Sequence, residues 1–283
     1  MSRKITVAQA AGFCFGVKKA IDRAEQQDEA YIFGSLIHNP QEVARLDTLG
    51  KHIVHSLDDV KGNRVFITAH GLDIAKINEM KARNLDIVDT TCPLVTHIYR
   101  SGWKMQAQGL RVVIIGDPKH VEVRGIASRM ADPIIVYQDS DLEQVPRGSR
   151  IGVVSQSTLL LEKFDRFVGL LKERCEQVES VNTICKPTKD RQTAAKALAQ
   201  EVDVMIVIGG YNSSNTHKLA DVAAERLGHD NTHHIETAQE LKQEWFDGKQ
   251  HVGVTAGAST PDYLIHEVVA AIDALPTNLI AVH

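Results

Sequence analysis

The sequence has no long hydrophobic run and no excess of basic residues, and each absence excludes a class of protein. Apolar runs such as residues 204–208 have the length of a strand and are too short to span a bilayer. The first residues are basic but lack the apolar segment of a secretory signal. The net charge of −4 over 283 residues gives no support to nucleic-acid binding. We therefore expect a cytoplasmic protein that has neither a membrane nor a nucleic acid as partner.

Several familiar binding motifs are also missing. The four cysteines include no C-x-x-C pair, which excludes a zinc ribbon and ferredoxin-type ligation, and a cytoplasmic chain is not expected to form disulfides. The sequence lacks the Gly-Lys-Ser/Thr ending of a P-loop and the spaced glycines of a dinucleotide-binding fingerprint. No linker rich in Gly and Ser divides the chain, so any modules should pack closely around a shared centre.

The chain contains instead an order of elements that recurs three times. A β-like run leads through a cysteine to a helical segment, and two further strand-like runs lead to polar loops. This alternation predicts parallel βαβ units in an α/β fold. We expect three αβα modules, each of roughly 90 residues, which is near the lower range for domains. Their expected bounds are residues 1–91, 92–184 and 185–283.

Three cysteines occupy the same place in these modules. The β-like runs before Cys14, Cys92 and Cys185 are Ile5–Val7, Ile87–Val88 and Val181–Ile184. Thiolates delivered one per module can hold a soft metal that no single segment could bind. Three isolated cysteines fit an iron–sulfur cluster with one iron left open as a Lewis acid. Taken singly, each thiol has the alternative role of a small core residue, which is our interpretation of Cys175 in an amphipathic helical stripe.

Polar side chains follow the remaining strand-like runs. The carboxyl ends of parallel strands open on one edge of a sheet, so these groups can converge on one pocket. Loops rich in Gly, Ser and Asn present backbone N–H groups and a helix N-terminus to an anion, which favours a phosphate or diphosphate ligand. Glu122, two residues after His120, is the candidate proton donor. The alternative for Asn212–Asn215 is a simple helix cap. The whole set comprises His38, His70, His120, Glu122, Ser157, Thr158, Ser213, Ser214, Asn215 and Ser259.

These segments resemble the 4-hydroxy-3-methylbut-2-enyl diphosphate reductase family. The resemblance runs from Val7 to about Val268. The motifs that carry it are Gly12–Val17, Ile37–Asn39, Ala69–Gly71, Asp89–Pro93, Asn212–Asn215 and Thr255–Ser259. The resemblance implies a pseudo-threefold trefoil of three αβα domains around a central iron–sulfur site. It also implies one 4Fe–4S cluster that is bound by Cys14, Cys92 and Cys185 and has one open iron.

The resemblance further implies an activity and roles for the polar residues. The substrate's allylic alcohol would bind the open iron, and two electrons from a reduced ferredoxin or flavodoxin would break the C–O bond with loss of water. Protonation at either end would give isopentenyl or dimethylallyl diphosphate, in the last step of the methylerythritol phosphate route to isoprenoids. Glu122 would relay protons, and Ser157 or Thr158 would lie near the alcohol. The diphosphate would be held by His38, His70, His120, Ser213, Ser214, Asn215 and Ser259.

The chain departs from the family's pattern at three motifs. Lys119 and Val121 replace Gly and Pro beside His120, and Lys186-Pro187 replaces Tyr-Ala after Cys185. The third change is milder, with Ser157 in place of Thr between Gln156 and Thr158. A lysine beside the cluster can raise its potential, and a proline can reshape the start of the helix. Two alternatives stay open beside this resemblance. One is an iron–sulfur lyase similar to quinolinate synthase, and the other is a diverged, non-catalytic protein that binds an iron–sulfur cluster or a diphosphate.

Overall fold

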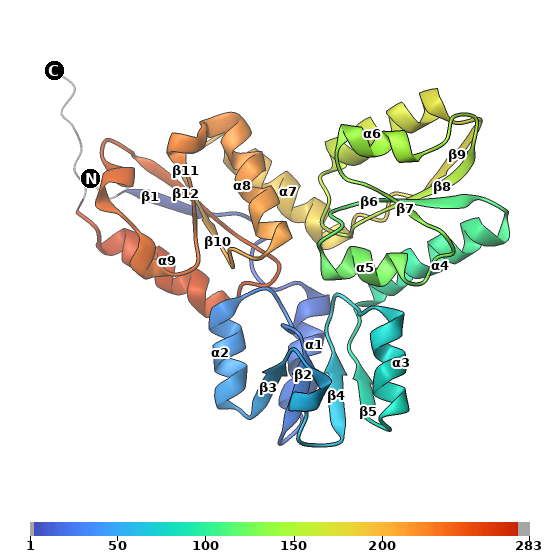
Figure 1. The fold of residues 1–283 in the computed structure, drawn as a ribbon. Helices are drawn as coiled ribbons and strands as arrows, with labels where there is room; N and C mark the ends of the chain where they lie inside the picture. The colour runs from blue at the N-terminus through green and yellow to red at the C-terminus, as the bar shows by residue number, and fades with distance from the viewer. Residues whose placement is uncertain (1–2, 277–283) are drawn as a thin grey trace. The chain divides into compact units, whose positions relative to one another are not determined.

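A computed structural model describes residues 3–276, which form three four-stranded parallel sheets (Figure 1). Sheet A consists of β1 (Lys4–Val7), β10 (Val204–Ile208), β11 (Thr232–Ile235) and β12 (His251–Ala256). Sheet B consists of β2 (Ala30–Phe33), β3 (Lys51–Val54), β4 (Arg64–Ile67) and β5 (Asp86–Asp89). Sheet C consists of β6 (Arg111–Ile115), β7 (Ile134–Val136), β8 (Arg150–Ser155) and β9 (Gln177–Ser180). The expected α/β class is confirmed.

Helices connect the strands, as parallel pairing requires. The described helices are α1 (Phe15–Glu25), α2 (Pro40–Thr48), α3 (Ile74–Ala82), α4 (Pro93–Ala107), α5 (Val121–Ala127), α6 (Leu161–Arg174), α7 (Lys186–Leu198), α8 (Ser214–Leu227) and α9 (Asp262–Ala274). Over residues 3–276, none of these combines the length and apolar character needed to cross a bilayer.

The three sheets share one strand order. The orders are β3-β2-β4-β5 in sheet B, β7-β6-β8-β9 in sheet C and β11-β10-β12-β1 in sheet A. The N-terminal strand β1 thus takes the place in sheet A that β5 and β9 take in theirs. The threefold repeat is therefore permuted, and each cysteine loop follows the last strand of one sheet.

This pairing corrects the expected position of the first strand. We placed Ile5–Val7 in the first module, but β1 pairs in parallel with β12, with Ile5 opposite Val252. A β-like run shows where a strand forms and not which distant strand it pairs with, so the local pattern could not reveal this. The module bounds at residues 91 and 184 remain predictions.

The chain packs as two compact units. The first comprises residues 3–17, 38–45 and 186–276 and contains sheet A with α7, α8 and α9. The second comprises residues 18–37 and 46–185 and contains sheets B and C with α3, α4, α5 and α6. The segment that begins at His38 therefore packs with sheet A and not with the sheet that precedes it in the chain.

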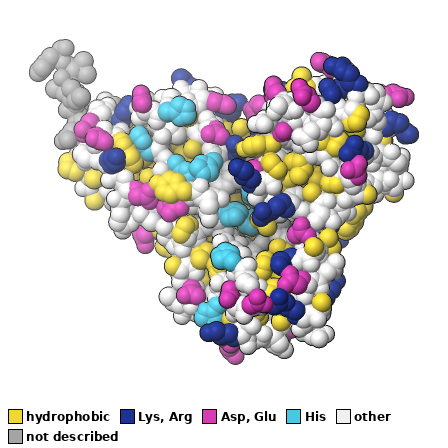
Figure 2. Space-filling view, viewed as in Figure 1, with side chains coloured by type: hydrophobic (Ala, Val, Ile, Leu, Met, Phe, Trp, Pro, Cys, Tyr) yellow, Lys and Arg dark blue, Asp and Glu magenta, His cyan; other side chains and the backbone are white. Residues whose placement is uncertain are grey.

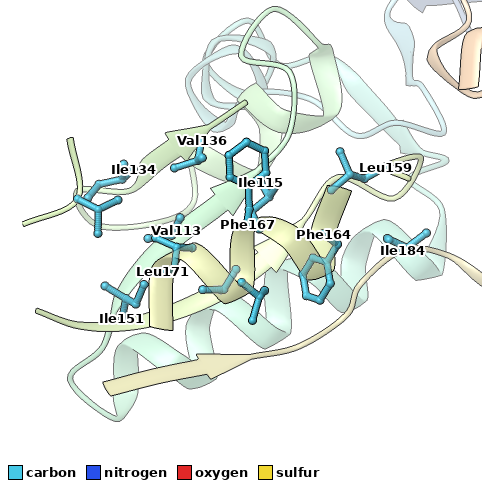
Figure 3. Packing of buried hydrophobic residues seen from close by; sticks show 13 residues of the cluster. Val113, Ile115, Ile134, Val136, Ile151, Leu159, Phe164, Phe167, Leu171 and Ile184 are labelled. Carbon is cyan, nitrogen blue, oxygen red and sulfur yellow. The ribbon is translucent and has the colours of Figure 1, made fainter. Parts of the chain in front are cut away.

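Sheet C shows why its strands are apolar at successive positions. Val113 and Ile115 of β6 pack on one face with Phe167 and its neighbours on α6 (Figure 3). Val112 and Ile114 turn to the opposite face, where residues of α4 and α5 cover them. A strand covered on both faces must be apolar throughout, because both sets of side chains leave water. The αβα layering expected from the sequence is thus present in this sheet.

Two local expectations near the third cysteine need correction. The strand before Cys185 is Gln177–Ser180, and the run Val181–Ile184 lies in the loop that follows. The hydroxyl of Thr183 accepts from the Ser155 amide at 2.7 Å and donates to the Ser155 carbonyl at 2.7 Å. A side chain thus occupies the groups that a backbone ladder would have used, which ends the strand.

Cys175 directly follows the last residue of α6, so it lies at the end of the helix and not within the helical stripe to which we assigned it. Cys175 is partly buried against the hydrophobic cluster of sheet C, as interpreted from the sequence.

At the surface, acidic and basic side chains are interspersed over the face seen in Figure 2, in keeping with the small net charge.

Candidate functional site

The three cysteines singled out from the sequence occupy equivalent positions in the structure. Each follows the last strand of a sheet (β1, β5 or β9) and immediately precedes a helix (α1, α4 or α7). The amides of Cys14, Cys92 and Cys185 donate to the carbonyls of Ala258, Ala69 and Ser157, at 3.1, 2.9 and 3.0 Å. Each acceptor is the second residue after the strand next to it in the sheet, β12, β4 or β8. The same backbone geometry therefore presents a cysteine three times.

The chemistry of this donor set suits a soft metal centre. Over the described residues, none of the four cysteines forms a disulfide, and the three in question are partly exposed. A helix N-terminus stabilises negative charge, and therefore a thiolate ligand. Neither unit, in its described part, groups three or more His, Cys, Asp or Glu side chains so as to hold a single metal ion. An iron–sulfur cluster differs from a single ion, because its thiolates bind different irons.

Two more equivalent positions contain most of the polar candidates. The fifth residue after β2, β6 and β10 is His38, His120 and Ser213 respectively. The third residue after β4, β8 and β12 is His70, Thr158 and Ser259 respectively. All these loops lie at the carboxyl ends of parallel strands, where ligands of open α/β sheets bind. The first unit contains Cys14, His38, Ser213, Ser214, Asn215 and Ser259, and the second contains Cys92, Cys185, His70, His120, Glu122, Ser157 and Thr158.

Glu122 is a buried carboxyl group in the second unit, 1% exposed, in the first turn of α5. Its Oε1 accepts from the Ser157 amide at 2.6 Å, and its Oε2 accepts from the Ser157 hydroxyl at 2.7 Å. Burial raises the pKa of Glu122, and the two bonds from Ser157 oppose that shift only in part. A carboxyl group that keeps its proton to higher pH than usual suits a proton donor.

His70 and His120 lie next to each other in the same unit. Their ring centroids are 5.7 Å apart and the rings meet edge to face. The Nδ1 of His120 accepts from the Glu122 amide at 3.2 Å as the N-cap of α5. A neutral His120 must then have its proton on Nε2.

The segment Ser213–Asn215 lies at the start of α8 and caps that helix, as the alternative interpretation of this segment predicted. Ser213 is the N-cap, and its Oγ accepts from the Thr216 amide at 3.3 Å and from the Thr216 hydroxyl at 2.9 Å. Both bonds use the oxygen as acceptor, so the Ser213 hydroxyl proton can still be donated elsewhere. Ser214 is the first residue of α8, where backbone amides lack partners within the helix. Capping and anion binding are therefore compatible here.

Asn215 shows the clearest sign of a ligand. Its side chain is 4% exposed, and its Oδ1 accepts from the Thr188 hydroxyl at 3.5 Å. Its buried Nδ2 has no hydrogen-bond partner among the described residues. A buried donor left unsatisfied costs about 1–3 kcal/mol. An oxygen acceptor supplied by a ligand would remove that cost.

His38 lies beside this loop in the first unit. Its carbonyl accepts from the Ser259 hydroxyl at 3.0 Å. A Cβ at Gly210 would meet the same carbonyl at 2.6 Å, so the glycine permits this close approach. Burial lowers the pKa of His38, which keeps its ring neutral at neutral pH.

The second unit contains a buried tyrosine that no sequence motif marked. Tyr99 on α4 is 4% exposed, and its hydroxyl has no hydrogen-bond partner among the described residues. The Arg129 guanidinium lies over the ring, 4.3 Å from its centroid, and burial raises the pKa of Tyr99. The hydroxyl lies against Gly71, next to His70, where an added Cβ would be only 2.1 Å away. No local pattern marks this contact, because it forms between distant segments.

This contact predicts the effect of a side chain at position 71. Gly71 has a φ of +78°, and Gly71→Ala adds the steric conflict with Tyr99 to that backbone strain. We expect a loss of about 2–5 kcal/mol in the free energy of unfolding, measured by urea titration. Gly71→Ala combined with Tyr99→Phe should recover part of the loss, since the hydroxyl is gone. A double variant no more stable than the single one would contradict this explanation.

Two of the residues that depart from the family's pattern, Lys186 and Pro187, lie at the start of α7. The Lys186 Nζ pairs with Asp190 at 2.7 Å, and the lysine side chain is 82% exposed. Solvent and Asp190 both weaken its field, so its effect on a nearby centre should be smaller than the sequence suggested. Pro187 lies in the first turn of α7, where its missing N–H has no partner to lose. The helix starts at Lys186 despite the proline.

Comparison with known proteins decides the family. A profile of the LytB protein family matches residues 5–273. The chain belongs to the LytB protein family. It is 40% identical to 4-hydroxy-3-methylbut-2-enyl diphosphate reductase of Nitratiruptor sp. over 94% of this chain and 97% of that protein. This membership confirms the resemblance inferred from the motifs and leaves the quinolinate synthase alternative without support.

Solved structures of LytB relatives agree with this assignment. One, described as (E)-4-hydroxy-3-methyl-but-2-enyl diphosphate reductase, the terminal enzyme of the non-mevalonate pathway, is 40% identical and matches with a TM-score of 0.70. The match covers 95% of this chain and 99% of that one. The reductase of Plasmodium falciparum is 26% identical, with a TM-score of 0.90 over 99% of this chain and 91% of that one.

Proposed function

We infer that this LytB protein is a 4-hydroxy-3-methylbut-2-enyl diphosphate reductase, acting in the last step of the non-mevalonate route to isoprenoids. The family match over residues 5–273 and relatives about 40% identical over nearly the whole chain support this activity. The reaction adds two electrons and two protons to the substrate and breaks its C–O bond. One proton leaves with the hydroxyl group as water, and the other goes to carbon, which gives isopentenyl or dimethylallyl diphosphate.

We propose that Cys14, Cys92 and Cys185 hold one 4Fe–4S cluster that has one iron without a protein ligand. The observation that supports this ligand set most directly is the shared placement of the three cysteines, each with the same backbone bond at the start of a helix. When bound, such a cluster supplies electrons and a Lewis-acidic iron. The electrons would come from a reduced ferredoxin or flavodoxin.

Glu122 is the proposed proton donor for the reaction. It is buried, its raised pKa favours the protonated form, and Ser157 fixes both of its oxygens. A fixed carboxyl group loses little orientational freedom when it transfers a proton. Ser157 and Thr158 follow β8 and are proposed to lie near the substrate alcohol, with the Thr158 hydroxyl accepting from Gln156 at 3.1 Å.

The diphosphate would be held by neutral donors. The hydroxyl of Ser213 keeps a proton to donate, and Asn215 has a buried donor with no partner among the described residues. Hydrogen bonds from neutral groups to a charged phosphate are strong in a site that excludes water. The proposed set consists of His38, His70, His120, Ser213, Ser214, Asn215 and Ser259.

Asn215→Ala tests this part of the proposal. Loss of one hydrogen bond to a charged group, worth about 1.5–3 kcal/mol, should raise KM for the diphosphate substrate about 10- to 150-fold, with a smaller change in kcat. Asn212→Ala, which truncates an exposed amide three residues earlier, is the matched control and should leave KM unchanged. Equal KM values for Asn215→Ala and the wild type would argue against a contact with the substrate.

The activity itself is tested under anaerobic conditions. Cluster-loaded protein is incubated with 4-hydroxy-3-methylbut-2-enyl diphosphate and a chemical reductant, and the products are separated by chromatography. We expect isopentenyl and dimethylallyl diphosphate at many turnovers per protein. Binding of the substrate without turnover would favour the non-catalytic alternative, and absence of both binding and products would contradict the proposed function.

A further inference from the structure

Arg191 is a buried arginine that no sequence motif marked. It lies on α7, six residues after Cys185, and is 6% exposed. Its Nη2 donates to the Gly12 carbonyl at 2.6 Å and its Nε to the same oxygen at 3.2 Å. Its Nη1 donates to the Pro187 carbonyl at 2.9 Å. The guanidinium thus ties the loop before Cys14 to the helix after Cys185.

Burial of this charge requires an explanation. Removing a guanidinium from water costs several kcal/mol even when its N–H groups are satisfied. Two of its N–H groups are directed at a single carbonyl, an arrangement that the planar fork of arginine provides. The carbonyl belongs to Gly12, two residues before a proposed cluster ligand. Because burying the Arg191 guanidinium costs free energy, we expect this side chain to have a role beyond packing.

The loop before Cys14 is the longest of the three cysteine loops. Cys14 is the seventh residue after β1, Cys185 the fifth after β9 and Cys92 the third after β5. A longer loop is freer to move unless other contacts hold it. The Cys14 amide bond to Ala258 fixes the cysteine itself, and Arg191 fixes the residue two positions before it.

The two shorter loops have their own supports. Before Cys92, the Asp89 carboxylate accepts from the Thr91 amide at 2.8 Å and from the Thr91 hydroxyl. Before Cys185, Thr183 bonds to both backbone groups of Ser155. In each cysteine loop, a side-chain hydrogen bond thus holds a residue one or two positions before the cysteine. Before Cys14, the support comes from Arg191 on α7, which is 179 positions from Gly12 in the sequence.

We propose that Arg191 is a positioning residue for the Cys14 ligand. Its guanidinium holds the Gly12 carbonyl, keeps the Cys14 thiolate in place for the cluster, and adds positive charge near that ligand. This inference rests on the proposed function, because it requires that Cys14 binds the cluster. Residues that support metal ligands from outside the coordination sphere typically change metal affinity 10- to 100-fold when removed.

The test compares Arg191→Met and Arg191→Lys with the wild type, all purified and reconstituted without oxygen. Two readouts are the iron content per chain and the rate at which a chelator removes iron. We expect about 10- to 100-fold faster iron release from Arg191→Met, with an intermediate rate for Arg191→Lys, which keeps the charge but not the fork. Lys196→Met, which changes an exposed cation on the same helix, is the control and should match the wild type.

The reduction potential provides a readout that loss of packing alone would not move in the same way. Removing a positive charge near the cluster should lower its potential in Arg191→Met, and Arg191→Lys should stay close to the wild type. If Arg191→Met does not fold, the rate of iron release from Arg191→Lys tests the inference instead. Wild-type iron release in both variants would overturn the inference. A wild-type protein that binds no cluster would instead refute the proposed function.

Discussion

Glu122→Gln should lower kcat by about 10²- to 10⁴-fold while it leaves KM for the diphosphate substrate nearly unchanged. Glutamine keeps the size of the side chain and can still accept from the Ser157 amide, but it has no acidic proton to give. Steady-state kinetics with a chemical reductant measures both constants. Glu42→Gln changes another buried glutamate, one paired with Arg45, and should keep most of the turnover. A Glu122→Gln variant with wild-type kcat would remove Glu122 from the mechanism.

The pH dependence of turnover follows from the same residue. Burial raises the pKa of Glu122, so its protonated form persists above the ordinary value of 4.5. The wild-type rate should fall as pH rises through this raised pKa, because the proton donor is lost. In Glu122→Gln the residual rate should not show that decline. A decline of the same size in both proteins would assign it to another group.

Stability should change with pH in the same direction. The folded carboxyl group of Glu122 binds its proton more tightly than the unfolded chain does, so protonation favours the folded state. This contribution is complete below the unfolded value of 4.5 and is lost as pH rises through the raised folded pKa. Urea unfolding at several pH values should show a smaller decrease in stability for Glu122→Gln than for the wild type.

Cys14→Ser, Cys92→Ser and Cys185→Ser should each lose most of the bound iron and lower turnover by at least about 100-fold. The magnitude follows because removing even an indirect supporting residue typically costs 10- to 100-fold, and a direct ligand should cost more. Iron and sulfide analysis after anaerobic reconstitution measures the first effect, and product formation measures the second. The three variants should behave alike, since their backbone environments are equivalent.

Cys175→Ser is the matched control for these three variants. Cys175 is also partly buried and free, but it packs against the hydrophobic cluster of sheet C and lies just after α6. Its replacement should affect stability and leave the iron content unchanged. Full iron content in any one of the three other variants would remove that cysteine from the proposed ligand set.

The features that sequence predicted well are those that local patterns determine. The helices that begin directly after Cys14, Cys92 and Cys185 were expected, and so were the apolar central strands of each sheet. Their signals are a run of apolar residues and its boundary, which depend on neighbours in the chain. The polar loops at the strand ends followed from the same boundaries.

Other features depend on contacts between distant segments. The pairing of β1 with β12 and the bond from Arg191 to Gly12 join parts of the chain that no local pattern connects. The edge strands β3 and β11 escaped notice because they are short and include His52, His233 and His234 among their few residues. Edge strands are often short and polar, which hides them from a search for hydrophobic runs.

The most direct test of the central claim is the iron of the anaerobically purified wild-type protein. Iron and sulfide analysis combined with Mössbauer spectroscopy determines how many irons are bound and whether one of them differs from the rest. We predict about four irons and four sulfides per chain, with one iron distinct because it lacks a cysteine ligand. Protein that binds no cluster after reconstitution, or a single iron without sulfide, would contradict the account.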